Sequence, residues 1–395
     1  MKTQLQQHLH NVISEKKLNY LYRQRLCHQQ AQGVLLHIDK TPHLSFCSND
    51  YLGLANDPQS NAVLQQAVAH YGIGAGSAHL VSGHQSAHQQ LEQRLAKFTQ
   101  REQALLFSTG YMANLGVITA LVSRHDAIFM DKLNHASLVD AGLLSRAKIH
   151  RYRHGDMAHL AQLLRKSQAR HRLIVTDGVF SMEGDIAPIP DLVALANKYQ
   201  AWLMVDDAHG LGVLGEQGRG TLAQFNVDSD DVPILMGTLG KAFGGFGAFI
   251  AGDALLIDYL IQTARTYIYT TALPPALATA MTHTIETVEQ ADLQRAHLRH
   301  LIQTFKQLAD EYAIPLLDSD TPIQGVILAQ ADIALAVSQQ LYQQGILVTA
   351  IRPPTVPANS ARLRITLSAK HTVAQVKQLI IRLKIAINTV IYTHP

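Results

Sequence analysis

Short apolar runs alternate with amphipathic stretches through the middle of the chain. Each run is rich in branched and aromatic residues, and the stretch after it has helical spacing, a pattern typical of strands alternating with helices. The runs are ALLFST (104–109), AIFMD (127–131), RLIVTD (172–177), WLMVDD (202–207), ILMGT (234–238) and GAFIAG (247–252). This alternation predicts an α/β fold, in which helices cover both faces of a mostly parallel sheet.

The two ends of the chain carry different patterns. Apolar residues recur at helical spacing from residue 3 to about residue 32, which predicts an N-terminal helix packed on the body. A long helix is expected from Pro274 to about Tyr312, followed by short strands and two further helices. The last helix should begin at Thr372, with Gln375 completing a capping box. We therefore expect an N-terminal helix and extension, a large domain and a small C-terminal domain, at residues 1–55, 56–285 and 286–395.

Composition narrows the classes of protein. A chain of 395 residues exceeds the usual single core, and 47% apolar with 16% charged residues is a globular composition. The net charge of +3 is small, and the basic residues are scattered, which argues against nucleic acid as a partner. Two cysteines, Cys27 and Cys47, without metal or disulfide spacing fit a reducing cytoplasm. The N-terminal segment lacks the apolar core of a signal peptide, and no apolar run is long enough to span a membrane, so a membrane location is not expected.

One lysine stands among small residues at the end of an expected strand. The stretch GTLGKAFGGFG (237–247) places Lys241 after an apolar run and before a series of glycines. Desolvation lowers the pKa of an ammonium group and releases the nucleophilic amine, so the position suits Schiff-base chemistry. The same residue could instead be an ordinary solvated lysine or a point charge that binds phosphate.

A second stretch supplies carboxylates at the same edge of the expected sheet. WLMVDDAH (202–209) is an apolar strand that ends in Asp206, Asp207 and His209. Open α/β sheets bind ligands at the carboxyl edge. Pyridoxal 5′-phosphate (PLP) requires a lysine for its aldehyde, a carboxylate for its ring nitrogen and an anion site for its phosphate. Asp206 and Lys241 could meet the first two needs, whereas Asp207 should point to the opposite face.

Three other motifs fail on spacing or context. A phosphate-binding loop needs a glycine and a hydroxyl residue where Leu235 and Ala242 stand, so a P-loop hydrolase is disfavoured. The stretch GIGAGS (72–77) follows a helical pattern and lacks the spacing of a dinucleotide fingerprint. His84 and His88 are four residues apart, but no third ligand is expected nearby, so we expect surface histidines and no metal.

Seven blocks in order resemble the α-oxoamine synthases, PLP-dependent enzymes of fold type I. They are SNDYLGLANDP (48–58), FSTGYMAN (107–114), LNHASLVD (133–140), TDGVFSMEGDIAP (176–188), VDDAHGLGVLGEQGRG (205–220), GTLGKAFGG (237–245) and IRPPTVPANSARLRITLSA (351–369). The resemblance covers nearly the whole chain. It implies a mostly parallel seven-stranded sheet in the large domain, bound PLP, and a homodimer with active sites at the subunit interface.

The resemblance also assigns roles to single residues. Lys241 would hold the cofactor, and His135 would stack on its ring and assist the reaction. The cofactor-binding residues it implies are Gly110, Tyr111, His135, Ser181, Asp206, His209, Thr238, Lys241 and Thr271. The substrate-binding residues it implies are Arg23, Asn49, His135, Arg352 and Thr355.

Two blocks bear on the substrate. VSGHQSAHQQLEQ (81–93) and IRPPTVP (351–357) are most similar to family members that condense L-alanine with a pimeloyl thioester and release carbon dioxide. The acyl carrier, coenzyme A or acyl carrier protein (ACP), stays open. A glycine C-acetyltransferase of the same family is the nearest alternative. A non-catalytic regulatory subunit of the same fold is the alternative of another class, and it would be expected to lack the lysine.

Overall fold

The chain forms two compact units, which are described separately. The structure, a computed structural model, describes residues 2–393. The larger unit contains residues 49–181 and 185–296, and the smaller one contains the described parts of 1–48, 182–184 and 297–395. The three domains expected from the sequence, 1–55, 56–285 and 286–395, stay a prediction.

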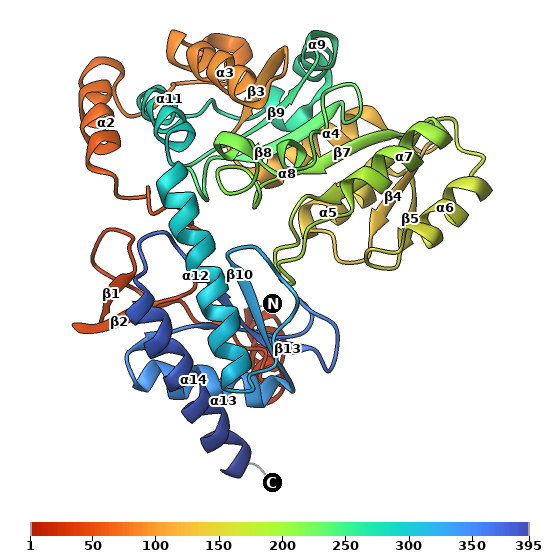
Figure 1. Cartoon of the computed structure of the whole chain (residues 1–395). Helices are drawn as coiled ribbons and strands as arrows, with labels where there is room; N and C mark the ends of the chain where they lie inside the picture. The colour runs from red at the N-terminus through yellow and green to blue at the C-terminus, as the bar shows by residue number, and fades with distance from the viewer. Residues whose placement is uncertain (1, 394–395) are drawn as a thin grey trace. The chain divides into compact units, whose positions relative to one another are not determined.

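A seven-stranded sheet forms the centre of the larger unit, with strand order β3-β9-β8-β7-β6-β4-β5 (Figure 1). The strand β9 runs antiparallel to both of its neighbours, and the other pairs are parallel. The sequence prediction of a mostly parallel sheet is therefore confirmed. The strands are β3 (Gln103–Phe107), β4 (Ala127–Asp131), β5 (Lys148–Tyr152), β6 (Arg172–Asp177), β7 (Trp202–Asp206), β8 (Ile234–Thr238) and β9 (Ala248–Gly252).

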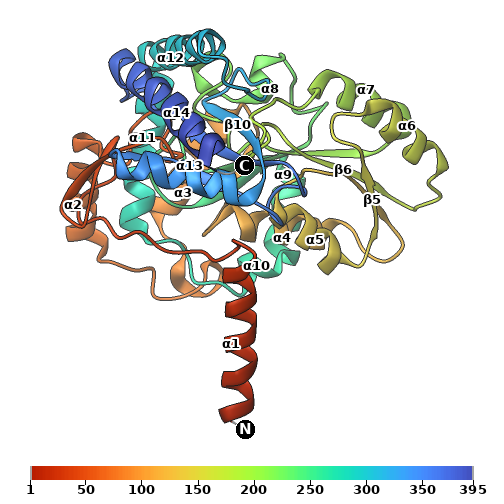
Figure 2. The ribbon, with the colours of Figure 1, turned by 90° about the horizontal axis from the view of Figure 1, so that it is seen from below.

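Helices cover both faces of this sheet (Figure 2). Alternate side chains of one strand enter two different cores: Met204 of β7 packs in one, and Leu203 and Val205 pack in the other. Burial on both faces explains why the strands are continuous apolar runs. The helical elements of this unit are α2 (Pro58–Tyr71), η1 (His79–Gly83), α3 (Ser86–Thr99), α4 (Gly110–Leu121), α5 (Ala136–Ser145), α6 (Met157–Lys166), α7 (Ile189–Tyr199), η2 (Glu216–Gly218), α8 (Thr221–Gln224), α9 (Ala254–Thr263), α10 (Arg265–Ile268) and α11 (Pro275–Glu289).

Two local features differ from the sequence expectation. The strand β5 was not among the predicted runs, because its sequence KIHRY is largely polar and it lies at the edge of the sheet. The long helix expected from Pro274 to Tyr312 is two helices, α11 and α12 (Asp292–Glu311), with a break at Gln290 and Ala291. The break leaves the Arg295 side chain room to donate hydrogen bonds to the carbonyl oxygens of Val288 (2.6 Å) and Glu289 (3.0 Å).

The smaller unit holds two three-stranded sheets, with orders β1-β2-β11 and β10-β13-β12. The predicted capping box is confirmed at the last helix: Thr372 N–H donates to Gln375 Oε1 (2.9 Å), and Gln375 N–H donates to Thr372 Oγ1 (3.2 Å). The elements are α1 (Lys2–Leu18), β1 (Leu35–Ile38), β2 (Thr41–Ser45), β10 (Ile323–Ala329), α13 (Ala331–Gln343), β11 (Ile346–Leu347), β12 (Thr349–Ile351), β13 (Ala361–Thr366) and α14 (Val373–Thr393), together with most of α12.

The N-terminal helix is shorter and more exposed than its spacing predicted. The helix ends at Leu18 rather than near residue 32, and Figure 2 shows α1 as one continuous helix. Leu5 and Leu9 are 60% and 48% exposed, so the predicted packing of this stripe is wrong for the described chain. Helical spacing of apolar residues specifies a stripe but does not say what covers it.

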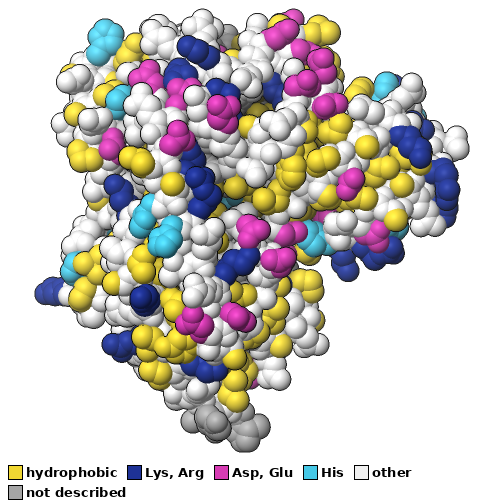
Figure 3. All heavy atoms as spheres, in the orientation of Figure 1, with side chains coloured by type: hydrophobic (Ala, Val, Ile, Leu, Met, Phe, Trp, Pro, Cys, Tyr) yellow, Lys and Arg dark blue, Asp and Glu magenta, His cyan; other side chains and the backbone are white. Residues whose placement is uncertain are grey.

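The surface agrees with the small net charge. Basic and acidic side chains are intermixed over the face in Figure 3. Among residues 2–393, no helix combines the length and apolar character that a membrane crossing needs.

Candidate active site

A pocket of about 190 Å³ lies in the larger unit, where β6, β7 and β8 end. Seven of the predicted residues line it: Gly110, Tyr111, His135, Asp206, His209, Thr238 and Lys241. Asn114, Ser137, Asp177, Ala208 and Met236 complete the lining. The carboxyl ends of parallel strands meet at one edge of a sheet, and this geometry brings side chains from distant segments together.

A chain of hydrogen bonds links Asp206 to His135 through Asn114. The amide Nδ2 of Asn114 donates to Asp206 Oδ2 (2.7 Å) and to Ser137 Oγ (2.8 Å). Since Ser137 Oγ accepts from Asn114, its own proton is directed to His135 Nδ1, 2.7 Å away. The other oxygen of Asp206 accepts from Ala208 N–H (3.1 Å). The carboxylate and the imidazole are therefore held in fixed orientations by one amide side chain.

The same network sets the tautomer of His135. Its Nδ1 also accepts Ser137 N–H (3.3 Å), because His135 caps the N-terminus of α5. The ring proton is consequently on Nε2. Burial lowers the pKa of His135; the charge of Asp206 opposes this effect and that of Lys241 adds to it. At neutral pH the residue is a neutral imidazole with an N–H donor at Nε2.

A second aspartate stands beside Asp206. Asp177 ends β6, and the sheet register pairs it with Asp206 at the end of β7. Its Oδ2 accepts His135 N–H (2.8 Å). Burial, and after it the charge of Asp206, raises the pKa of Asp177 well above its ordinary value. Two carboxylates side by side do not both ionise easily, so the neighbouring Asp206 disfavours ionisation of Asp177.

The next two polar residues of the WLMVDDAH stretch face different surroundings. His209 Nδ1 is hydrogen-bonded to Tyr51 Oη (2.7 Å), and the Tyr51 side chain is fully buried. Asp207 has no exposed surface, and it accepts Thr221 N–H (2.7 Å) and the Thr221 hydroxyl. Burial raises the pKa of Asp207 to about 7. Asp207 thus anchors the turn after β7 and does not face solvent.

The far end of the pocket is built from a helix start and a glycine turn. Thr109 caps α4 by accepting Met112 N–H (3.2 Å), and the first two residues of the helix, Gly110 and Tyr111, line the pocket. The Tyr111 hydroxyl donates to Asp140. Thr238 Oγ1 donates to the Gly247 carbonyl (3.0 Å) and accepts Gly240 N–H (3.2 Å). Helix N-termini attract anions, which makes this end suited to a phosphate group.

Comparisons with known proteins identify the family. A family model described as aminotransferase class I and II matches residues 41–383. The 8-amino-7-oxononanoate synthase of Nitrosococcus oceani is 55% identical over 368 residues, which span 93% of this chain and 98% of that protein. The chain belongs to the 8-amino-7-oxononanoate synthase family, within the class I and II aminotransferases.

Solved structures agree on the fold. An 8-amino-7-oxononanoate synthase from Francisella tularensis is 34% identical, with a TM-score of 0.78, over 89% of this chain and 99% of that one. A serine palmitoyltransferase from S. paucimobilis with a bound PLP–myriocin aldimine is 28% identical, with a TM-score of 0.92, over 96% of this chain and 97% of that one. The fold is therefore that of the fold type I PLP-dependent transferases, as the sequence resemblance implied.

The pocket fits the cofactor that this family implies. An amine, a fixed carboxylate and a helix N-terminus are the three groups that PLP requires, and Lys241, Asp206 and α4 supply them around one pocket. Gly110 also keeps the wall open, because a Cβ at this position would approach Met236 Cε to 2.5 Å. The lining therefore supplies the groups that the cofactor requires.

Three other predicted residues of the larger unit do not line this pocket. Ser181 lies in the loop after β6, as the last residue of the first segment of the larger unit, and it is not among the lining residues of the pocket. Asn49 accepts a hydrogen bond from Tyr51 Oη (3.3 Å), and the same hydroxyl group is hydrogen-bonded to the pocket residue His209. Thr271 is exposed and pairs with Ala78 in an isolated bridge. Their predicted roles stay predictions.

The remaining predicted substrate residues belong to the smaller unit, where they lie near one another. Arg352 donates to the Tyr20 carbonyl, and Thr355 N–H donates to the Arg352 carbonyl (3.1 Å). Burial and the charge of Arg23 lower the pKa of Arg352. Two guanidinium groups held close together form a place that favours a carboxylate.

Sequence reasoning missed three members of the site. Asn114 stands four residues after Gly110, at the end of the block FSTGYMAN, where helical spacing places it on the same face. Asp177 ends one strand as Asp206 ends the next, which is the signal for a shared sheet edge. Tyr51 is 158 residues from His209, and the sequence carries no local signal that joins them.

Outside this pocket, the structure corrects the expectation for His84 and His88. A third histidine, His79, does lie nearby, and the ligand nitrogens of the three lie within 4.8 Å of one another. His79 and His88 are buried rather than solvated surface residues.

Proposed function

We propose that this chain binds PLP and condenses L-alanine with a pimeloyl thioester, releasing 8-amino-7-oxononanoate, carbon dioxide and the thiol of the acyl carrier. The observation that carries the proposal is the pocket that Lys241 and Asp206 line together in a chain of this family. Loss of carbon dioxide from alanine and addition of the pimeloyl group give the nine-carbon skeleton of the product.

When bound, PLP supplies an aldehyde that couples to amines and a ring that accepts the electrons left at Cα of the amino acid. The protein groups do the rest. Lys241 Nζ would hold the cofactor, and its free amine would remove the proton from Cα of alanine and later return one. Asp206, whose carboxylate is held in a fixed orientation by Asn114 and Ala208, would hold the ring nitrogen.

His135 and His209 orient the reacting groups. The Nε2–H of His135 is available as a donor, because Nδ1 is occupied by Ser137, and it hydrogen-bonds the thioester oxygen during attack. His209, fixed by Tyr51, would hydrogen-bond the phenolic oxygen of the cofactor. The N-terminus of α4 at Gly110 and Tyr111, together with Thr238, binds the phosphate, and Ser181 contacts the cofactor. Arg352, with Arg23, Asn49 and Thr355, binds the substrate carboxylates and the acyl group.

The decisive assay offers the purified protein with PLP two pairs of substrates. L-alanine with pimeloyl-CoA or pimeloyl-ACP should give 8-amino-7-oxononanoate, identified by mass spectrometry, and release of carbon dioxide. Glycine with acetyl-CoA should give far less product. Turnover confined to glycine and acetyl-CoA would instead assign a glycine C-acetyltransferase, and binding of PLP without turnover of either pair would favour the regulatory subunit.

We also propose a homodimer in which Thr271 binds the cofactor phosphate of the neighbouring subunit. Thr271 is exposed and does not line the pocket of its own chain, which supports this role. Mixing a Lys241→Ala chain with a Thr271→Ala chain tests it, because a mixed dimer with shared sites contains one site with both residues intact. Activity should recover in the mixture. If each chain instead uses its own Thr271, the mixture stays as inactive as its parents.

A further inference from the structure

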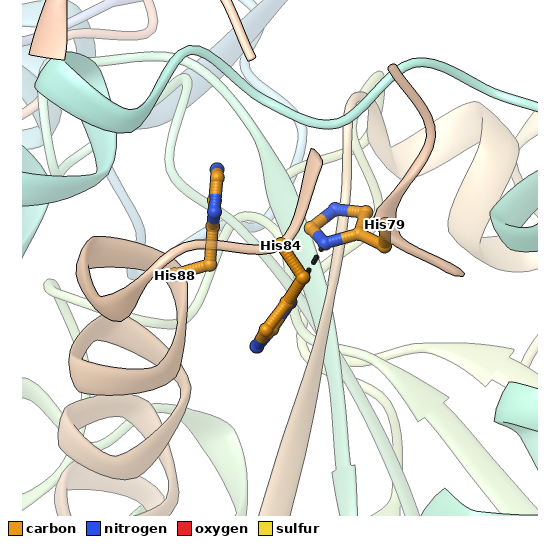
Figure 4. A group of neighbouring side chains, drawn as sticks. All are labelled: His79, His84 and His88. Atoms are coloured by element: carbon orange, nitrogen blue, oxygen red, sulfur yellow. Dashed lines mark hydrogen bonds between the residues drawn. The ribbon is translucent and has the colours of Figure 1, made fainter. Parts of the chain in front are cut away.

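Three histidines form a cluster at the start of α3, away from the residues that line the cofactor pocket. His79 begins η1, His84 follows this element, and His88 lies in the first turn of α3 (Figure 4). The ring centroids are 5.2 Å (His79–His84), 5.0 Å (His79–His88) and 5.6 Å (His84–His88) apart. Three imidazoles bound to one tetrahedral ion at about 2.0–2.1 Å have centroids roughly 5 Å apart. The cluster therefore has the dimensions of a three-histidine metal site.

The nitrogen atoms of two of these rings face each other. His79 Nδ1 and His84 Nδ1 are 2.9 Å apart, which requires one of them to carry a proton and the other to accept it. Two ligand nitrogens on a tetrahedral ion are separated by roughly 3.4 Å, given bonds of about 2.0–2.1 Å. A small outward shift of the two rings thus makes room for a divalent cation between the two Nδ1 atoms. The proton that these atoms shared then moves to Nε2 of the ring that carried it.

His88 is prepared as the third ligand. Its Nε2–H donates to the Leu273 carbonyl (2.6 Å), the contact that metal-bound histidines usually make with their second nitrogen. Its Nδ1 accepts Gln85 N–H (2.9 Å), and an ion at Nδ1 would displace this one bond. Gln85 is only half-buried, so water can satisfy the displaced N–H group.

A carboxylate lies behind His84. Glu92 Oε2 is 4.0 Å from His84 Nε2, while Glu92 Oε1 accepts Leu106 N–H (3.0 Å). When Nδ1 of His84 binds a cation, its Nε2–H is directed to Glu92, and this carboxylate–histidine–metal arrangement orients the ligand. His79, His84 and Glu92 also line a cavity of about 670 Å³, which gives an ion access to the cluster.

The protonation states favour a cation. Burial, then the neighbouring His88 and His84, lowers the pKa of His79 to about 3. Burial also lowers the pKa of His88. Both rings are neutral at pH 7, which is the form that binds metal ions.

We propose that His79, His84 and His88 form a binding site for a divalent first-row transition metal ion of the zinc class, with Glu92 orienting His84. The ion would brace the segment around His79 against the segment around Leu273. These segments already meet through the Ala78–Thr271 bridge and the hydrogen bond from Ala272 N–H to the Ser77 carbonyl (3.0 Å). The site is structural in character, since its ligands do not line the cofactor pocket.

Titration of the PLP-loaded protein with Zn²⁺, followed by calorimetry, tests the proposal. We expect one ion per chain in the wild type, and at least a hundredfold weaker binding after His84→Asn or His79→Ala. Glu92→Gln should weaken binding about tenfold, as the loss of an orienting partner does. His70→Ala, which removes an exposed histidine of α2, is the matched control and should bind as the wild type does.

Two further readouts separate the cluster from other histidines and from folding. Co²⁺ bound by three nitrogen ligands should give visible d–d absorption in the wild type and in His70→Ala, but not in His84→Asn. Hydrogen exchange of residues 77–88 should slow on addition of Zn²⁺ in the wild type alone. Unchanged circular dichroism and PLP absorbance in His84→Asn would show that the variant folds. Binding of equal stoichiometry and affinity in the wild type and His84→Asn, or no saturable binding at all, overturns the proposal whatever the catalytic activity is.

Discussion

The larger unit contains two buried groups of histidines, and their neighbours differ in charge. In the cofactor pocket, His135 lies among Asp206, Asp177 and Lys241, and the charges of Asp206 and Lys241 shift its pKa in opposite directions. In the cluster at α3, the groups that shift the pKa of His79 are other histidines, and burial and these neighbours act in the same direction.

The contrast shows that burial alone does not decide what a histidine can do. Asn114 and Ser137 fix the proton of His135 on one nitrogen, which makes the residue a donor of defined direction. At His79 and His84 the two facing nitrogens share a proton, so neither ring is committed to donating to a single partner atom. One arrangement suits hydrogen bonding to a reacting group, and the other suits a metal ion.

The largest effect is expected at the amine of the pocket. Lys241→Ala should lower kcat by at least about 10³-fold, because it removes the group that moves the Cα proton. The measurement is product formation from L-alanine and pimeloyl thioester. Lys148→Ala, at an exposed position of β5, is the control and should keep wild-type turnover. Retention of activity in Lys241→Ala would show that this amine does not move the Cα proton.

The donor role of His135 predicts the next effect. His135→Ala should lower kcat by about 10²-fold, the usual consequence of removing one donor to a developing negative charge. His125→Ala, an exposed histidine of the same unit, serves as the comparison and should leave kcat unchanged. If the rate of acyl transfer measured in single-turnover experiments is the same in His135→Ala and the wild type, His135 has no such role.

The bridging amide is expected to contribute to stability as well as to orientation. Asn114→Ala removes the donor to both Asp206 and Ser137. Each buried acceptor left without its partner costs about 1–3 kcal/mol, so the free energy of unfolding should fall by that order. Urea denaturation of the PLP-loaded protein measures the change. A variant as stable as the wild type would mean that water replaces the amide.

The last effect is a change in the pH dependence of stability at Asp207, which follows Asp206 directly after β7. Its folded pKa of about 7 is higher than the value of an unfolded aspartate, so the folded state binds more protons between about pH 4 and pH 7. This group therefore lowers the free energy of unfolding as pH rises through that window, by at most about 1.4 kcal/mol per pH unit. Asp207→Asn should remove that contribution. Identical pH profiles of unfolding for the two proteins would contradict the raised pKa.

Much of the larger unit could be predicted from the chain alone. The apolar runs that became β3, β4 and β6 to β9 are buried on both faces, and such burial leaves a continuous apolar pattern in the sequence. The cap at Thr372, in the smaller unit, is equally local, since it joins residues three positions apart. Lys241 and Asp206 were recognised because each ends an apolar strand, and parallel strands bring such ends to one edge.

Other features depended on packing. The polar strand β5 forms because β4 offers it an edge, and the α1 stripe stays exposed although its spacing is helical. The contacts of Asn114 to Ser137 and to Asp206 join residues 23 and 92 positions apart, and the contact of Tyr51 to His209 spans 158 positions. The sequence determined which segments are strands and which polar residues end them. The tertiary structure decided which side chains meet, since sheet register and helix packing, rather than local spacing, set distances between remote residues.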